Sequence, residues 1–395
     1  MRRTVVLLLF TAVFVGEVMW SAIVPLVPAF AHRFGLSPLQ SGLLLASASV
    51  AILLVSVPAG MLGERLGARR VTLAAMAVLA VADAGQGLAG TFWELLAART
   101  LFGVGFGALW TTGVAWLTEA AREHQSQVLS LTVTTAGLGA VAGPAFAGVL
   151  VQRYGLAAPF AVAAGVTVLL GAWLSLERSG SGRAAAPARA TLPALAAAMR
   201  ERRVTASLAL MGLGGLLGGA VNLLVPLQLH RNGVSTAAIG AAFAASAVLF
   251  IASSAAVAHL GERAARAGVG AAATAIAGAI LVLVLVSTST AAVVGFLILR
   301  GPVSAVIYTV TFPLGVRGGR AAGIGVATMA ALLNIVWALS TLVAPIVAGA
   351  LAQTVGDRAA YGLVAVLCLA AAPWIAAART AAPAAQAGAG RTTSA

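Results

Sequence analysis

Four charged side chains interrupt long apolar runs of this sequence, and they are its clearest candidates for chemistry. Glu17 and Asp83 are carboxylic acids, whereas Arg99 and Arg300 are permanent cations. Burying any one of them in a membrane costs at least ~2.5 kcal/mol, so each should have a partner, a wet cavity or a function. A carboxyl group in such a place can take up and release a proton when its surroundings change, as in a proton relay.

The composition explains why these charges are exceptional. Of 395 residues, 61% are hydrophobic and only 9% are charged, whereas soluble globular proteins have roughly 25% charged residues. This excludes an ordinary soluble protein and indicates a polytopic membrane protein. The net charge of +14 comes from 24 Arg against 10 Asp and Glu, and the arginines are spread over short loops. This argues against a nucleic-acid partner, because a protein that binds nucleic acid gathers its basic residues on one face.

Metal, redox and nucleotide chemistry have no support in the sequence. One cysteine and four scattered histidines predict neither a disulfide nor a metal site. A phosphate-binding loop of the G-x-x-x-x-G-K-[ST] type is missing as well. Neither an enzyme nor a cofactor is therefore expected, and any step that needs energy would draw on an ion gradient.

Twelve apolar runs are long enough to be membrane helices. They cover about 4–31, 38–62, 70–90, 92–117, 126–151, 156–177, 204–229, 236–258, 268–287, 290–315, 321–352 and 359–379. This predicts an all-α membrane protein with an N-terminal six-helix bundle (1–177), a polar cytoplasmic linker (178–203), a C-terminal six-helix bundle (204–379) and a disordered tail (380–395).

The arginines predict the orientation. With both termini in the cytoplasm, 18 of the 24 Arg face the cytoplasm, four face outward, and Arg99 and Arg300 lie within spans. The positive-inside rule therefore favours a multi-pass protein with cytoplasmic termini, and the compact chain with its all-Arg, Ala-rich composition indicates a bacterial-type inner membrane. We expect it to work as a monomer among membrane lipids.

The two halves repeat one another. Gly63-Glu64-Arg65 recurs 198 residues later as Gly261-Glu262-Arg263, and Arg99 recurs 201 residues later as Arg300. Six spans followed by six related spans of the same orientation form a parallel repeat, as in transporters whose halves meet around a midplane site.

The charged loop after the second span resembles the G-x-L-a-D-r-x-G-r-k motif of the major facilitator superfamily. Glu64 stands for the usual Asp, and Ala68 for a basic residue. The resemblance implies two six-helix bundles that alternate access, with this loop as an inner gate. The expected gating residues are Gly60, Gly63, Glu64, Arg65, Gly67, Arg69, Arg70 and the second copy, Gly261, Glu262 and Arg263.

A second motif, in the fifth span, is similar to the signature of the twelve-helix drug:proton antiporters. Gly139, Gly143, Pro144 and Gly148 match it. Small residues and a proline kink suit a helix at the interface of the halves. In that family the motif accompanies export.

The resemblance also implies which helices line the cavity: the first, fourth, seventh and tenth. That would place Glu17, Arg99, Asn222 and Arg300 around one space, with Glu17 or Asp83 carrying the proton and Arg99 beside it. The expected cavity residues are Trp20, Trp110, Asn222, Arg300, Tyr308 and Asn334.

The predicted function is proton-coupled efflux of small amphipathic or cationic, drug-like molecules, giving multidrug resistance. Two alternatives stay open: efflux or uptake of a sugar, amino acid or other metabolite, and a non-transporting membrane sensor with the same fold. The few Asn, Gln and Tyr at mid-depth disfavour a sugar site, and the short linker and tail disfavour a sensor.

Overall fold

The computed structural model describes residues 3–121, 125–177, 192–259 and 266–378. Within these ranges the chain is helical without strands. Twelve helical spans are long and apolar enough to cross a membrane, which confirms the twelve predicted spans and the all-α class. Helices prevail because a backbone in lipid must satisfy its own hydrogen bonds.

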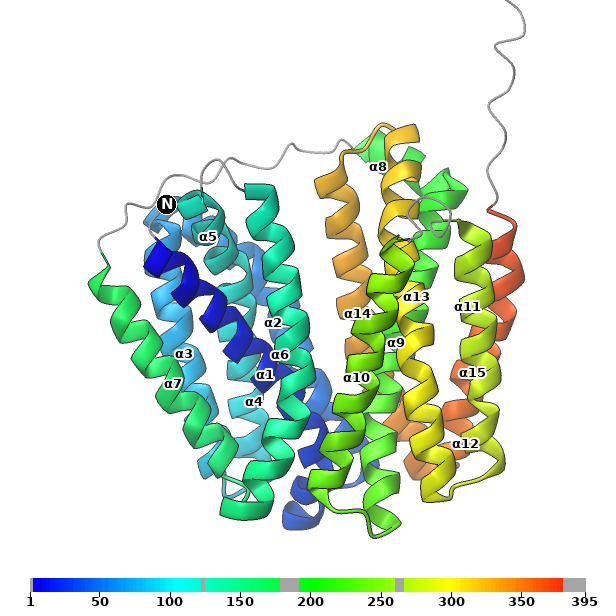
Figure 1. The fold of residues 1–395 in the computed structure, drawn as a ribbon, viewed down its shortest axis with the longest axis horizontal. Coiled ribbons are helices and arrows are strands. Elements are labelled where there is room, and N and C mark those ends of the chain that lie inside the picture. Colours follow the sequence, from blue (N-terminus) through cyan, green and yellow to red (C-terminus); the bar gives the residue numbers. More distant parts are fainter. Residues whose placement is uncertain (1–2, 122–124, 178–191, 260–265, 379–395) are drawn as a thin grey trace, which may run out of the picture.

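The spans form two groups that lie side by side in Figure 1. The first group comprises α1 (Arg3–Phe34), α2 (Pro38–Leu66), α3 (Ala68–Leu88), α4 (Phe92–Ala108), the π-helical turn η1 (Leu109–Gly113), α5 (Val114–Ala121), α6 (Gln125–Tyr154) and α7 (Ala158–Leu176). The second comprises α8 (Leu192–Arg200), α9 (Arg202–Arg231), α10 (Thr236–His259), α11 (Ala267–Ile280), α12 (Val282–Val286), α13 (Thr290–Ala321), α14 (Val326–Thr354) and α15 (Asp357–Ala376).

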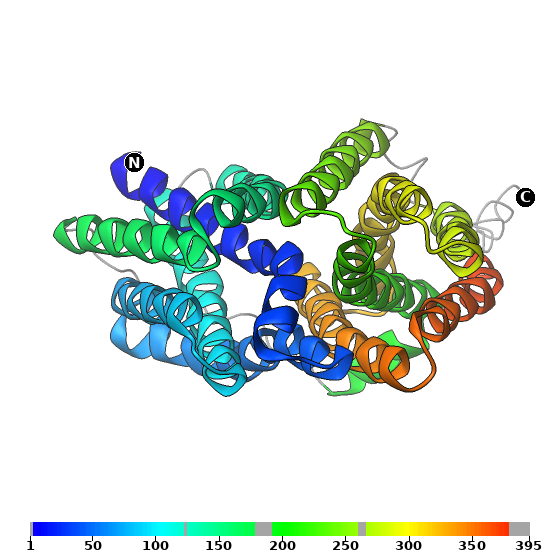
Figure 2. The ribbon, with the colours of Figure 1, turned by 90° about the horizontal axis from the view of Figure 1, so that it is seen from below.

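Helix α1 begins and α15 ends on the same side of the molecule, which we call the N-terminal side (Figure 1). The opposite side, where residues 35–37 join α1 to α2, is the hairpin side. Figure 2 views the molecule from there and shows α6 beside α10 between the two groups.

The sequence repeat is visible in the turns of the hairpin side. Gly35 follows α1 and Gly233 follows α9, both with positive φ (63° and 81°). Gly155 and Gly356 follow α6 and α14 in the same way (86° and 105°). A side chain is strained in this conformation, so glycine occupies the matching turns of both halves.

Several features of the helices differ from the prediction. The eleventh span was expected at 321–352, but α13 continues to Ala321 and α14 begins only at Val326. Gly323, with φ of 78°, reverses the chain between them. The fourth span is also interrupted by η1, and the segment expected as a polar linker contains the short helix α8.

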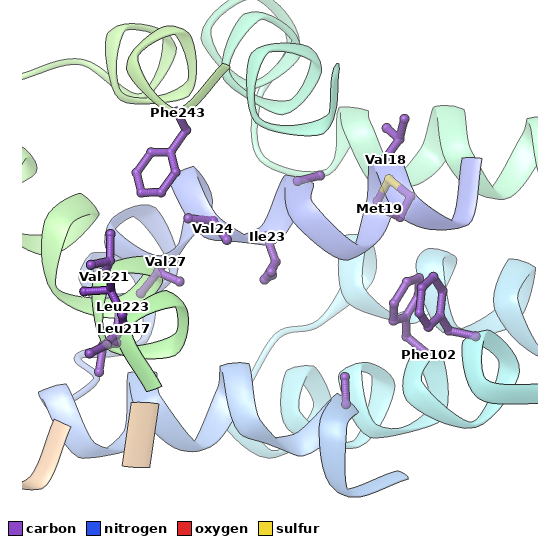
Figure 3. Packing of buried hydrophobic residues seen from close by; sticks show 14 of the residues in the cluster. Val18, Met19, Ile23, Val24, Val27, Phe102, Leu217, Val221, Leu223 and Phe243 are labelled. Carbon is purple, nitrogen blue, oxygen red and sulfur yellow. The ribbon is translucent and has the colours of Figure 1, made fainter. Parts of the chain in front are cut away.

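A continuous apolar core includes residues of both groups. Figure 3 shows α1 at its centre, with Phe102 of α4 on one side and Leu217 and Val221 of α9 on the other. Val27 of α1 and Leu217 are each at most 1% exposed. Helix α1 is therefore held between the halves, where its polar residues can act on both.

Candidate functional site

A cavity of about 410 Å³ lies between the two groups, within the ~300–1,000 Å³ range of small-molecule sites. Residues of α1, α2, α4, α6, α9, α10, α13 and α14 line it. Its aromatic lining consists of Trp20, Phe243, Phe250, Tyr308 and Trp337. Its polar lining consists of Ser21, Ser49, Arg99, Asn222, Ser246, Arg300 and Thr341. The cavity thus combines a large apolar surface with few polar groups.

The cavity contains four of the six residues expected there: Trp20, Asn222, Arg300 and Tyr308. Trp110 and Asn334 are not among the described lining residues, and the Asn334 side chain is exposed. Arg99 lines the cavity as expected, but Glu17 does not. The expected ring of four residues is therefore a ring of three, with the carboxyl group of Glu17 outside it.

Arg99 is anchored from α4 onto α1. Its two terminal nitrogens donate to the backbone oxygens of Met19 (3.4 Å) and Trp20 (3.1 Å). Its guanidinium carbon lies 4.6 Å from the centre of the Phe102 ring and 5.5 Å from that of Trp20. These contacts fix a buried cation at the junction of α1 and α4.

Asp83 lies behind Arg99, away from the cavity. Its side chain is 2% exposed and accepts a hydrogen bond from Gln86 of the same helix (3.3 Å). Arg99 interacts with it electrostatically. The acid that interacts with Arg99 is therefore Asp83 of α3, and not Glu17, the expected neighbour.

Glu17 has a different partner, the indole of Trp110. The Trp110 Nε1 group donates to Glu17 Oε1 at 2.9 Å. Trp110 belongs to η1, where Thr111 and Thr112 hydroxyls bond the carbonyls of Gly107 and Ala108 (2.8 and 2.9 Å). Such back-bonding disturbs an α-helix, and π turns often mark functional sites.

Stacked rings connect this carboxyl group with the cavity. The Trp20 ring, which lines the cavity, stacks on Phe106 with centroids 5.3 Å apart. Phe106 in turn contacts Trp110 edge-on at 6.4 Å. Glu17 and the cavity thus share no space, but a row of packed aromatic side chains links them.

The antiporter-like motif packs α6 against α1 at this same place. A Cβ on Gly139 would lie 2.7 Å from the Glu17 Cβ. One turn further, Gly143 lies against Ser21 and the Val18 carbonyl. Only residues without a side chain allow this approach, so the motif brings the helix backbone directly onto the face that carries Glu17.

The rest of the motif forms a contact between the halves near the hairpin side. Gly240 of α10 lies directly against the Pro144 carbonyl of α6. A Cβ on Gly148 would lie 2.9 Å from the Ala237 Cα of α10. We call this contact the α6–α10 seam.

A matching α2–α14 seam uses the repeated residues. Gly42 lies against the Pro345 carbonyl, and a Cβ on Gly349 would lie 3.0 Å from the Leu39 Cα. Gly42 and Gly240 are 198 residues apart, and Pro144 and Pro345 are 201 apart. The two seams close the hairpin side of the cavity by the same contact made twice.

Arg300 of α13 occupies the position in the second half that Arg99 occupies in the first. Its side chain is partly buried, and its buried Nε and Nη1 have no hydrogen-bond partner in the described part of the chain. Tyr308 interacts with it electrostatically. The Trp337 side chain lies close to the Tyr308 hydroxyl.

The expected gating loop connects α2 and α3 on the N-terminal side. Arg69 donates to the Ser175 carbonyl of α7 (2.6 Å), within the first group. Glu64, Arg65 and Arg70 are exposed. Over the described ranges no ion pair joins Glu64 to an arginine. The second copy, Gly261 to Arg263, lies outside the described residues.

Sequence reasoning missed several cavity residues that the repeat itself could have found. Phe243 and Ala247 follow Leu45 and Ser49 by 198 residues, and all four line the cavity. Asn222, Thr341 and Pro345 likewise follow Ser21, Ala140 and Pro144 by 201 residues. Transferring Asn222 and Pro144 across the repeat would have added Ser21 and Pro345 to the expected lining.

Comparison with known proteins agrees with this architecture. The chain matches the model of the Major Facilitator Superfamily over residues 9–330. A crystal structure of a bacterial homolog of the human lysosomal transporter Spinster, inward-facing and unoccupied, has the same fold. Its TM-score is 0.80 and its sequence identity 15%, over 95% of this chain and 96% of that one.

The curated relatives are similar over shorter segments. The MFS-type transporter ppzB of Metarhizium rileyi is 30% identical over 170 residues, 42% of this chain and 35% of that protein. The putative multidrug resistance protein MdtD of Shigella flexneri is 28% identical over 127 residues, 32% of this chain and 27% of that protein. The chain thus aligns with about a third of each relative's length. The family model nevertheless covers most of the chain, which is a multi-pass membrane protein of the Major Facilitator Superfamily.

Proposed function

We propose that the protein is a proton-coupled antiporter that exports small amphipathic molecules by alternating access. The observation that carries this proposal is the position of Glu17. A carboxyl group lies inside a membrane helix, is held by Trp110, and packs against Gly139 of the motif that resembles the antiporter signature. An acid so placed is costly unless it is used, and proton transfer is its most common use in transporters.

The aromatic row supplies a route for coupling. Cargo that packs against Trp20 in the cavity would hold Phe106 and hence Trp110, the donor to Glu17, in place. Keeping that donor stabilises the carboxylate over the protonated acid, so bound cargo would disfavour proton binding, and the two would compete although they occupy different places.

Alternating access is supported by the two seams. The structure is closed on the hairpin side, which the arginine distribution predicts to face outward, and the Spinster homolog of the same fold is inward-facing. Export is further supported by MdtD, whose name describes a multidrug resistance protein. The membrane would then be the cytoplasmic membrane of the cell.

The test uses purified protein in proteoliposomes with an acidic lumen. Naphthalenesulfonate and naphthyltrimethylammonium serve as probes, since their permanent charges prevent them from following a pH gradient passively. Wild-type protein should accumulate at least one probe, and Glu17→Gln should reduce uptake to the level of protein-free liposomes. Glu94→Gln is the matched control, because Glu94 is an exposed acid that caps the start of α4 through Gly90.

Two results would reject the proposal. One is gradient-driven accumulation by Glu17→Gln at the wild-type rate. The other is concentrative uptake by wild-type protein that persists after a protonophore has collapsed the gradient.

A further inference from the structure

The charge of the cavity lining is positive. Arg99 and Arg300 both line it, whereas none of its described lining residues is Asp or Glu. Glu17 lies outside the lining and is bonded to Trp110. Asp83 lines a separate pocket of about 10 Å³, too small for more than a single water molecule. A cationic cargo would therefore meet two guanidinium groups and no exposed acid.

The two arginines are not equivalent. The terminal nitrogens of Arg99 donate to Met19 and Trp20 carbonyls, leaving only Nε without an acceptor, and Asp83 interacts with it electrostatically. Arg300 has Nε and Nη1 buried without any acceptor in the described chain. A purely structural arginine would be expected to use such carbonyls, as Arg99 does.

Tyr308 adds a second donor beside Arg300. An indole nitrogen can only donate, so the Trp337 side chain close to the Tyr308 hydroxyl cannot accept its proton. The hydroxyl proton of Tyr308 remains available for another acceptor. The guanidinium and this hydroxyl together are suited to an oxyanion, because charge-assisted bonds from arginine to planar or tetrahedral oxyanions are among the strongest in proteins.

The remaining lining defines the other end of the ligand. Trp20 and Trp337 approach each other from α1 and α14, with ring centroids 6.4 Å apart. Phe250 contacts Tyr308 edge-on at 6.1 Å. Flat rings on both sides of the cavity favour an apolar, preferably aromatic body.

We propose that the cavity binds an amphipathic organic anion, with its carboxylate or sulfonate on Arg300 and Tyr308 and its apolar body between Trp20 and Trp337. The inference specifies the cargo of the proposed antiporter. It rests on that proposed function, because a bound anion is cargo only if the protein transports it. It replaces the expected cationic cargo. It also predicts that transport is electrogenic, because an anion leaving and a proton entering both move net positive charge inward.

The test is equilibrium binding to purified full-length protein in detergent, without any gradient. Tritiated naphthalenesulfonate, naphthalenesulfonamide and naphthyltrimethylammonium have the same ring system and differ in charge. Scintillation proximity should show at least ~10-fold tighter binding of the sulfonate than of either other probe. Arg300→Gln should remove this preference, Arg300→Lys should retain part of it, and Tyr308→Phe should reduce it by a few-fold.

Arg153→Gln is the control, since Arg153 is an exposed arginine at the end of α6. The measured quantity is the ratio of the affinities for the three probes. A poorly folded Arg300→Gln variant would lose all three probes together, and the probe preference of Arg300→Lys would then decide the test. Equal or tighter binding of the ammonium, undetectable binding of the sulfonate, or an unchanged preference in Arg300→Gln would overturn the inference. Anion binding without proton-driven uptake would instead reject the antiport while leaving the anion site intact.

Discussion

The paired seams on the hairpin side make a prediction about which conformation the protein occupies. Replacing Gly240 by alanine places a Cβ directly against the Pro144 carbonyl, a backbone atom that cannot move aside alone. The contact between α10 and α6 would have to loosen. States in which the hairpin side is open do not need this contact, so they would gain population.

The size of the shift follows from the cost of overpacking. Inserting a methyl group into a close contact costs about 1–3 kcal/mol. Since about 1.4 kcal/mol corresponds to a tenfold change in an equilibrium, the open state should gain roughly 5- to 150-fold. Gly42→Ala, in the α2–α14 seam, should act in the same direction, because Gly42 meets the Pro345 carbonyl in the same way.

Cysteine accessibility measures this shift. The single native cysteine, Cys368, is first replaced by alanine, and Ala140 in the cavity lining is replaced by cysteine as the reporter. A membrane-impermeant maleimide is added to right-side-out vesicles. Labelling from outside should be faster in Gly240→Ala than in the parent. Gly137→Ala, on α6, is the control, because nothing lies within 4 Å of a Cβ at that position.

The reasoning would be refuted if Gly240→Ala were labelled no faster than the parent while eluting as a monodisperse protein. Equal acceleration by Gly137→Ala would refute it as well, because the effect would then not depend on the seam.

Three further substitutions test other parts of the site. Trp110→Phe keeps the stacking ring but removes the donor to Glu17, and it should slow proton-driven uptake by about 10-fold or more with unchanged probe binding. Asp83→Asn removes the acid that interacts electrostatically with Arg99 but keeps an oxygen for the bond from Gln86, so it should destabilise the protein by only about 1 kcal/mol, measured by chemical unfolding in detergent micelles. Arg231→Gln removes an exposed ion pair between α9 and α15 and should cost less than about 1 kcal/mol in the same assay.

The fold was predictable because its signals are long and repeated. Twelve apolar runs, separated by charge, can hardly form anything but membrane helices. The repeat at 198 and 201 residues gave two related halves, and it reappears in the turns at Gly35, Gly233, Gly155 and Gly356. The boundary between α13 and α14 was missed because the sequence around Gly323 stays apolar while the chain reverses.

The site was predictable only in part. The sequence indicates how deep in the membrane a residue lies along its helix, but it does not indicate the direction in which the side chain points. Glu17, Asp83, Arg99 and Arg300 were recognised as intramembrane charges, but their partners depend on how the helices pack. Arg99 interacts with Asp83 across α3 and α4, while Glu17 is bonded by Trp110. Spacing along one helix says little about contacts between helices, so a Glu17–Arg99 pair was expected in place of these two.

The π-helical turn η1 has a consequence for how this site can vary among relatives. A π turn contains one residue more than the α-helical turn that it replaces. Deleting a single residue from Leu109–Gly113 would therefore restore a regular helix that still crosses the bilayer. The donor to Glu17 would be displaced, while Arg99, ten or more residues before the turn, would stay in place. Loss or gain of one codon here would thus convert a chain in which Trp110 donates a hydrogen bond to Glu17 into one in which that bond is missing, or the reverse.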